Sequence, residues 1–157
     1  MKLKITHCAI VWLLCFLFHQ SFLHASAHKK LSQRSFVIVT ASYNNEKWAQ
    51  KNLESVFSQD YPVDKFRVIY CDDCSTDKTL SIVNKFVTDY NVAHKIKIIH
   101  NEKRAGPHQN IYNAIRSCKP TEVAVIVDGD DWLAHDKVLS KLNEVYSNPD
   151  VWITYGQ

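Results

Sequence analysis

Short apolar runs alternate along the chain with stretches in which apolar residues recur at helical spacing. Residues 36–39 are a β-branched run of the kind found in buried strands. The next stretch predicts a helix that ends before Tyr61 and Pro62, and its apolar face is formed by Ala49, Leu53, Val56 and Phe57. The same order of strand and helix recurs along the rest of the chain.

Further strands are predicted at residues 66–70, 96–99 and 123–127, and a last one at 151–155 after the turn at 148–150. Asp77 is placed to cap the helix before the strand at 96–99, and Pro107 to lead into the following helix. The helices are predicted by apolar residues at helical spacing: Leu80, Ile82, Val83, Phe86, Val87, Ile111, Ala114, Ile115, Val138, Leu139, Leu142 and Val145.

The short connections between these elements require parallel strands joined by right-handed crossovers. Strands that are buried on both faces read as continuous apolar runs, as these do. The sequence therefore predicts an α/β fold with a doubly wound, mostly parallel sheet. Ligands of such sheets bind beyond the carboxyl ends of the strands, so the residues after positions 39, 70, 99 and 127 are the candidates for function.

The N-terminal segment differs from the rest of the chain. Lys2 and Lys4 precede an uncharged apolar run at 8–18, which is short for a membrane span, and small residues follow at 25–27. We expect residues 1–27 to be a signal peptide or signal anchor, residues 28–35 a linker, and residues 36–157 the folded domain. We expect the protein to enter the secretory pathway or to be anchored in a membrane through residues 5–23. The sequence leaves open which side of the membrane the domain would face.

Composition narrows the function classes. The 157 residues are 46% hydrophobic and 22% charged, which is the balance of one globular domain. The net charge of +3 is too small to suggest a nucleic-acid-binding protein. The chain's three glycines, Gly106, Gly129 and Gly156, lie far apart, which excludes a Walker A loop and a dinucleotide-binding fingerprint.

Acidic residues follow the second and fourth predicted strands, which could be neighbours in the sheet. Asp128, Asp130 and Asp131 lie within four residues around Gly129, which could let the backbone turn sharply. Like charges at this spacing repel each other unless a cation lies among them, and Mg²⁺ or Mn²⁺ takes one or two carboxylates together with water and phosphate. The alternative is a solvated acidic turn in which Asp130 or Asp131 caps the next helix.

Asp72 and Asp73 follow the second strand, and Tyr43 follows the first. A carboxylate at this position could accept hydrogen bonds from a base N–H or from ribose hydroxyls, and Tyr43 could stack on a base. Helix capping by the carboxylates and ordinary packing of the tyrosine are the alternatives. Trp132, directly after the acidic residues, is more typical of packing than of sugar binding.

Several segments, in order and spacing, resemble the family 2 glycosyltransferases of the GT-A fold. They are VIVTASYN at 37–44, SVFSQ at 55–59, DDCSTD at 72–77, the loop at 101–110 and DGDD at 128–131. The resemblance covers residues 35–157. It implies inverting transfer of a sugar from a nucleotide diphosphate donor of the UDP or GDP type, assisted by Mn²⁺ or Mg²⁺, to an unknown glycan, lipid or protein acceptor.

The resemblance also implies which residues form the site. Asp130 and Asp131 would bind the metal, and Asp128 would approach the ribose. The full set of expected donor-binding residues is Ser42, Tyr43, Asn44, Asp73, Arg104, Asn110 and Asp128. Members of the family continue into an acceptor half that supplies the general base, so the resemblance implies an apparently truncated, donor-binding half with no assigned base. The alternative is a non-catalytic module that binds a nucleotide sugar or a glycan.

The chain departs from the family pattern at Cys74, where Gly or Asn is usual, and at Gln109, where a basic residue often stands. The spacing of Cys71 and Cys74 invites a thiol oxidoreductase, but the acidic residues between them disfavour a thiolate. A structural disulfide between these two cysteines stays open. A receiver-like or phosphatase-like domain would need a lysine on a late strand, and residues 151–155 contain none.

Overall fold

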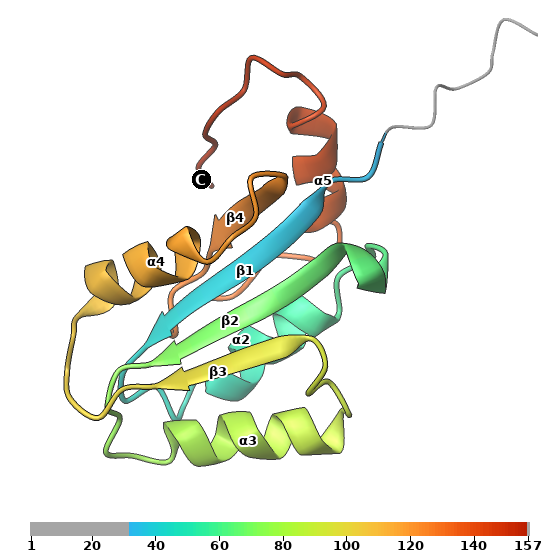
Figure 1. The fold of residues 1–157 in the computed structure, drawn as a ribbon. Coiled ribbons are helices and arrows are strands. Elements are labelled where there is room, and N and C mark those ends of the chain that lie inside the picture. Colours follow the sequence, from blue (N-terminus) through green and yellow to red (C-terminus); the bar gives the residue numbers. More distant parts are fainter. Residues whose placement is uncertain (1–31, 157) are drawn as a thin grey trace, which may run out of the picture. The chain divides into compact units, whose positions relative to one another are not determined.

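The structure is a computed structural model that describes residues 32–156. Strands and helices alternate along these residues, as expected (Figure 1). In chain order they are β1 (Ser35–Ser42), α2 (Ala49–Phe57), the 3₁₀ helix η1 (Val63–Lys65), β2 (Phe66–Asp72), α3 (Thr79–Asp89), β3 (Ile96–His100), α4 (Pro107–Arg116), β4 (Glu122–Ile126) and α5 (Val138–Val145). Helix α4 begins at the expected proline, and Asp77 accepts the Thr79 N–H at 2.9 Å at the start of α3.

The four strands form one sheet in the order β3-β2-β1-β4, and every pair is parallel. The register places Ser42 opposite Asp72, and Asp72 opposite His100. The carboxyl ends of the strands therefore meet at one edge of the sheet. Helices α2, α3 and α5 cover one face and α4 covers the other, so the predicted doubly wound α/β fold is confirmed (Figure 1).

The core lies on both sides of β1, which is buried from Phe36 to Ser42. Successive side chains of a strand point to opposite faces, so Phe36 and Ile38 pack toward α2 and α5, whereas Val37 and Val39 pack toward α4. Both faces of β1 are thus apolar, which explains why its sequence reads as an uninterrupted hydrophobic run.

Two expectations about the strands are wrong. Residues 151–156 form no strand, and Trp152, Ile153 and Tyr155 are exposed. The apolar run at 123–127 does contain a strand, but β4 lies at an edge of the sheet, is only half buried, and leaves Ile126 half exposed. An apolar, β-branched sequence reports strand propensity, and only the tertiary structure decides whether a partner strand covers it.

Residues 1–31 lie outside the described part of the chain, so the signal peptide or anchor at 1–27, membrane association through 5–23 and the first half of the linker at 28–35 stay predictions. Residues 32–156 fall in one compact unit. Among the helices of these residues, none has the length and apolar character needed to cross a bilayer.

Candidate functional site

A cavity of about 130 Å³ opens at the carboxyl edge of the sheet. Its lining comes from the end of β1, the residue after β2 and the segment that enters α4. The lining residues are Ala41, Ser42, Tyr43, Asp73, Arg104, Pro107 and Asn110. The fold therefore brings together five of the seven residues that the sequence assigned to donor binding, from positions up to 68 residues apart in the chain.

Asp73 is the most constrained side chain of this cavity and is 2% exposed. One carboxylate oxygen accepts the Ala105 N–H and the Asn101 side-chain amide, both at 2.8 Å. The other accepts the Gly106 N–H at 2.9 Å and Nε of Arg104 at 3.0 Å. Burial alone would raise the pKa of Asp73, but the Ala105 N–H, the side-chain amides of Asn110 and Asn101 and the Gly106 N–H outweigh it and hold the pKa well below its ordinary value.

The four donors fill the lone pairs that an ionised carboxylate offers. Asp73 therefore holds the loop of Arg104 and Gly106 against the end of β2. A base N–H could bond to this carboxylate only by sharing an oxygen with one of these donors or by replacing it. The exposed Arg104 is the donor most easily replaced, because the other three belong to the backbone or to a half-buried side chain.

Tyr43 and Arg104 form the outer wall of the cavity. The guanidinium carbon of Arg104 lies 3.4 Å from the centre of the Tyr43 ring. Each group presents a flat, polarisable surface, and both are exposed. This wall can therefore offer a planar ring a surface on which to stack.

The inner wall contains a buried amide with unused capacity. Asn110 is 4% exposed, and its side-chain oxygen accepts a hydrogen bond from Asn101 at 2.8 Å. Its NH₂ group makes no hydrogen bond of good geometry within residues 32–156, although it lies close enough to Asp73 to help lower the pKa of that carboxyl. A buried donor without an acceptor is unfavourable by about 1–3 kcal/mol, so a ligand oxygen at this point would be strongly favoured.

Ser42 lies where β1 ends and is 2% exposed. Its oxygen accepts hydrogen bonds from the hydroxyl of Tyr70 at 3.0 Å and from the side chain of Asn45 at 3.1 Å. Burial raises the pKa of Tyr70 to about 12, so this phenol stays protonated and donates. Because Ser42 accepts in both of these bonds, its own hydroxyl proton can be donated to another group.

The residues Asp128–Asp131, called the acidic loop below, follow β4 at the same edge. The Gly129 N–H donates to the carbonyl of Ala41 at 3.0 Å, which ties the loop to the end of β1. A Cβ at Gly129 would clash with Nδ2 of Asn45 and with Ser42, whose Oγ would lie 2.5 Å away. Glycine is therefore needed here because the backbone lies close to Ser42 and Asn45. The sequence had suggested a sharp turn as the reason, but Gly129 does not have the positive φ that favours glycine.

The carboxylates of Asp128, Asp130 and Asp131 are exposed. Within the described residues, the hydrogen bonds made by these three residues involve only their backbone atoms. No group of three or more His, Cys, Asp or Glu side chains converges in residues 32–156 to hold a metal ion by itself. A hard cation such as Mg²⁺ or Mn²⁺ takes one or two protein carboxylates and completes its shell with phosphate oxygens and water, and the exposed carboxylates of this loop are of that donor type.

The two acidic segments are not on neighbouring strands, contrary to expectation. Strands β2 and β4 flank β1 on opposite sides, about 10 Å apart at two strand spacings. Asp73 and the acidic loop therefore stand on either side of the end of β1. A ligand that reaches both must lie across that end.

Asn44 and Asp128 do not line the cavity. Asn44 has a φ of 53°, its N–H donates to Oγ of Ser75 at 3.0 Å, and its side-chain oxygen accepts the Thr76 N–H at 2.8 Å. These bonds join the loops after β1 and β2. A donor-binding role for Asn44 or Asp128 stays a prediction.

Sequence reasoning missed two polar pairs at this edge. Asn101 bonds to both Asp73 and Asn110, and Nδ1 of His100 lies 2.6 Å from the fully buried carboxylate of Asp72. The first residues after the predicted strand at 96–99 are His100 and Asn101, which was the available signal. Without the order of the strands, nothing in the sequence places them beside β2.

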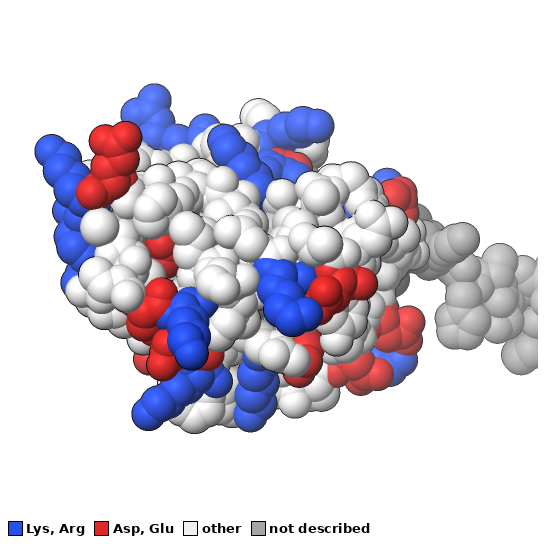
Figure 2. Space-filling view, turned by 90° about the horizontal axis from the view of Figure 1, so that it is seen from below, with Lys and Arg blue, Asp and Glu red and all other residues white. Residues whose placement is uncertain are grey.

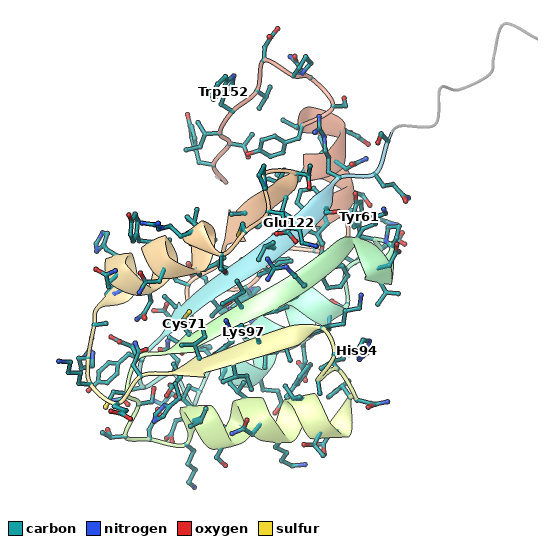
Figure 3. All side chains as sticks on the ribbon, viewed as in Figure 1. Tyr61, Cys71, His94, Lys97, Glu122 and Trp152 are labelled. Carbon is teal, nitrogen blue, oxygen red and sulfur yellow. The ribbon has the colours of Figure 1, made fainter. Side chains whose placement is uncertain are left out.

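Trp132 lies against the start of helix α2 but is 41% exposed, so it is not part of the core. Its ring lies 5.8 Å from that of Trp48, and the ammonium of Lys51 lies 3.3 Å from its ring centre. Within residues 32–156 the cysteines, at positions 71, 74 and 118, are free thiols, so the disulfide left open between Cys71 and Cys74 is not formed. Cys71 lies in the core beneath α4 (Figure 3), and burial raises its pKa to about 11, which disfavours thiol catalysis at neutral pH.

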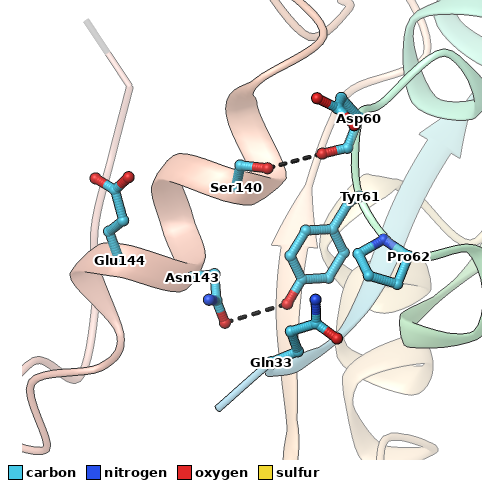
Figure 4. A pocket seen from close by; sticks show the side chains of 7 residues that line it. All are labelled: Gln33, Asp60, Tyr61, Pro62, Ser140, Asn143 and Glu144. Atoms are coloured by element: carbon cyan, nitrogen blue, oxygen red, sulfur yellow. Dashed lines mark hydrogen bonds between the residues drawn. The ribbon is translucent and has the colours of Figure 1, made fainter. Parts of the chain in front are cut away.

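A larger cavity, of about 680 Å³, lies at the opposite edge of the sheet (Figure 4). Four of its polar lining residues already bond to each other in pairs. The hydroxyl of Tyr61 donates to Asn143 at 3.1 Å, and the hydroxyl of Ser140 donates to the carbonyl of Asp60 at 2.7 Å. None of its lining residues belongs to the predicted site, so we assign the functional site to the smaller cavity.

Charged side chains on the face shown in Figure 2 are of mixed sign. Lys and Arg lie among Asp and Glu, with uncharged surface between them. A mixed surface of this kind does not produce the broad positive field that attracts nucleic acid.

The fold and the site together define an α/β ligand-binding domain whose cavity and acidic loop lie at the carboxyl ends of the strands. The particular family follows from comparison with known proteins. The chain belongs to glycosyl transferase family 2, whose family model matches residues 37–157. The fold is accordingly the GT-A fold that the sequence resembled.

Several proteins named as glycosyltransferases are similar to the chain. It is 34% identical over 98 residues to the poly(ribitol-phosphate) β-N-acetylglucosaminyltransferase TarS of Staphylococcus aureus. It is 40% identical over 67 residues to a dolichyl N-acetyl-α-D-glucosaminyl phosphate 3-β-D-2,3-diacetamido-2,3-dideoxy-β-D-glucuronosyltransferase of Methanococcus voltae. These matches cover 62% and 43% of the chain, but only 16% and 21% of the relatives.

Solved structures give the same result for the fold. The S. aureus TarS structure in complex with UDP-GlcNAc superposes with a TM-score of 0.61 at 32% identity, covering 70% of this chain and 30% of that one. The mannosyltransferase PcManGT of Pyrobaculum calidifontis, in complex with GDP-Man and Mn²⁺, superposes with a TM-score of 0.64 over 85% of this chain and 39% of that one. Its 20% identity supports the fold alone.

Proposed function

We propose that the chain binds a nucleotide diphosphate sugar at its carboxyl edge and forms the donor-binding part of an inverting glycosyltransferase. The observation that carries this proposal is the cavity, where five residues predicted from the family resemblance converge beside the acidic loop. TarS, a relative with the same fold, is known in complex with UDP-GlcNAc, which makes a UDP sugar the first donor to test.

The residues of the cavity suit a nucleoside. The flat surfaces of Tyr43 and Arg104 can stack on the base. The unused NH₂ of Asn110 can donate to a base carbonyl or a ribose oxygen. Asp73 keeps the loop of Arg104 in place and can accept a base N–H in exchange for Arg104.

The exposed carboxylates of Asp130 and Asp131 would hold Mn²⁺ or Mg²⁺, with Asp128 next to the ribose. Such a cation, when bound, neutralises the negative charge that develops on the departing nucleotide diphosphate. Inverting transfer also needs a general base that takes the proton of the acceptor hydroxyl. None of residues 32–156 is assigned that role, and the glycan, lipid or protein acceptor is not identified.

Calorimetry of the full chain with UDP and with GDP, each with and without Mn²⁺, tests donor binding. We expect at least one nucleotide to bind, and binding to tighten at least tenfold when Mn²⁺ is present. Asp130→Asn should remove the effect of the metal, whereas Asp150→Asn, an exposed aspartate of the last turn, should retain it. Failure of both nucleotides to bind under all conditions would refute the proposal.

Transfer is tested separately from binding. Release of UDP from UDP-GlcNAc, measured with the chain and with Asp130→Asn, should fall in the variant if the chain supports turnover. Donor binding without any release would favour the alternative, a non-catalytic module that binds a nucleotide sugar.

A further inference from the structure

The segment from β4 to α5 carries the acidic loop and contains no helix or strand between Val127 and Lys137. It is nevertheless fixed along its length by helix α2. Three polar side chains of α2 and of the turn that follows it, Asn52, Ser55 and Gln59, bond to the backbone of this segment. Their spacing places them on one side of the helix, beside the apolar stripe.

Asn52 holds the acidic loop itself. Its Nδ2 donates to the carbonyls of Asp128 at 3.0 Å and Asp131 at 2.8 Å, and the residue is 0% exposed. Because both contacts are carbonyls, the amide must point its NH₂ group at them. Its oxygen has no partner in the described part of the chain, so Asn52 acts on the loop as a double donor.

The next two side chains continue the attachment. Oγ of Ser55 accepts the Leu133 N–H at 3.0 Å. Gln59 donates to the carbonyl of His135 at 2.7 Å and accepts the Leu139 N–H at 3.0 Å. From the other side, Gly129 packs against Ser42 and bonds to Ala41. The acidic loop is thus fixed between α2 and the end of β1.

The bonds of Asn52 bracket the three carboxylates. The two carbonyls that it binds belong to the first and last residues of the acidic loop, so Asn52 reinforces a turn that is also closed by the bond from the Asp131 N–H to the Asp128 carbonyl at 3.0 Å. Mutual repulsion of Asp128, Asp130 and Asp131 favours a more open loop. A buried donor that reinforces the turn opposes this repulsion before a cation arrives, which is what a preorganised cation site requires.

We propose that Asn52 is a positioning residue for the divalent cation of the acidic loop. This role rests on the proposed function, since it presumes that the loop binds a cation together with a nucleotide diphosphate. Asn52 acts through the backbone of Asp128 and Asp131 and does not itself contact the cation. Groups that orient metal ligands from outside the metal's own shell typically change metal affinity 10–100-fold when removed.

The test compares two buried asparagines in the full chain. Asn52→Ala removes the donor of the acidic loop. Asn143→Ala removes a residue of α5 that is 7% exposed and accepts bonds from the Arg34 N–H at 2.8 Å and the Tyr61 hydroxyl at 3.1 Å, at the opposite edge. Both variants lose buried hydrogen bonds, so both should be less stable, but only the first touches the acidic loop.

Calorimetry with UDP is measured for both variants with and without Mn²⁺, at a temperature where circular dichroism shows each to be folded. We expect Asn52→Ala to weaken Mn²⁺-dependent binding about tenfold, to leave metal-free UDP binding unchanged, and to regain affinity at higher Mn²⁺ concentration. Asn143→Ala should bind as the wild type does. Unchanged Mn²⁺ dependence in Asn52→Ala, or equal weakening in both variants, would overturn the proposal.

A second readout needs no ligand. Hydrogen exchange of the Gly129, Asp131 and Leu133 amides should become at least tenfold faster in Asn52→Ala and stay unchanged in Asn143→Ala. Unchanged exchange in Asn52→Ala would refute the positioning role even if UDP binds as proposed. Faster exchange in a protein that binds no nucleotide, with or without Mn²⁺, would instead refute the proposed function, and with it any role toward a cation.

Discussion

Asp73 and the three aspartates of the acidic loop stand on either side of the end of β1, and they differ in burial and in hydrogen bonding. Asp73 is buried, accepts four hydrogen bonds and has a lowered pKa. Asp128, Asp130 and Asp131 are exposed, and their carboxylates make no hydrogen bond within residues 32–156. In the acidic loop it is the backbone that is fixed, whereas in Asp73 it is the carboxylate.

This difference shows that one carboxylate stabilises the structure of the site, whereas the others are available to bind a ligand. The Asp73 carboxylate is used to hold the Arg104 loop that forms one wall of the cavity. The carboxylates of the acidic loop stand on a fixed backbone, are exposed and make no hydrogen bond within residues 32–156, which leaves them available to a cation. The same residue type, at the same edge and after similar apolar strands, therefore has two different roles.

The largest expected effect on stability comes from Asp73. In Asp73→Asn an NH₂ group faces N–H donors where a carboxylate oxygen accepted them, so the free energy of unfolding should fall by roughly 3 kcal/mol. Urea denaturation at pH 7 measures it. Asp130→Asn is the matched control and should change stability by less than about 0.5 kcal/mol, since its carboxylate is exposed. Equal losses in the two variants would remove the contrast between the two regions.

The stabilisation by Asp73 should also depend on pH. Its folded pKa lies below its unfolded pKa of about 3.9, so the stabilisation is fully present above about pH 4 and is lost as the pH falls further toward the folded pKa. The stability difference between wild type and Asp73→Asn should therefore be constant from pH 7 to about pH 5 and shrink at lower pH. Urea denaturation of both proteins at each pH measures this difference, from which other titrating carboxyls largely cancel.

Gly129 tests the backbone of the acidic loop. In Gly129→Ala the new methyl group would overlap Ser42 and Asn45, which should destabilise the protein by about 2 kcal/mol and displace the loop. Gly156→Ala is the control, because nothing lies within 4 Å of a Cβ there. Thermal unfolding compares the two variants, and equal midpoints would show that the loop does not press against the end of β1.

The smallest expected effect is at Cys74, next to Asp73. Its φ of 63° is strained for any residue with a Cβ, so Cys74→Gly should stabilise the chain by about 0.5–1 kcal/mol. Cys74→Ala keeps the strain and should be no more stable than the wild type. Denaturation midpoints distinguish the two variants, and a stabilising alanine with a neutral glycine would contradict strain at this turn.

The predicted strands and helices agree with the structure where an apolar segment packs against another element or pairs with another strand. The run at 36–39 became the central strand, and the stripe of Ala49, Leu53 and Val56 became the buried face of α2. The run at 151–155 has an equally apolar pattern but pairs with no strand in the described residues. The apolar pattern of a segment indicates its preference for a strand, but strand pairing also depends on segments far away in the sequence.

Sequence motifs predicted most of the residues that line the cavity. The residues around the cavity, such as Tyr43, Asp73 and Arg104, were implied by the family resemblance that the motifs carry. Asn52 gave only a weak signal, a polar residue beside the apolar stripe of a helix. Its role became visible when α2 and the acidic loop, 76 residues apart, were seen in contact.

The sequence by itself determined the alternation of strands and helices, the placement of acidic residues at strand ends, and the family, because these depend on local order and spacing. Tertiary structure alone decided which strands are neighbours, which aspartate is buried, and which side chains fix the acidic loop. Burial and hydrogen bonding are set by groups distant in the chain, and they determine whether a carboxylate becomes part of the framework or stays available to a ligand.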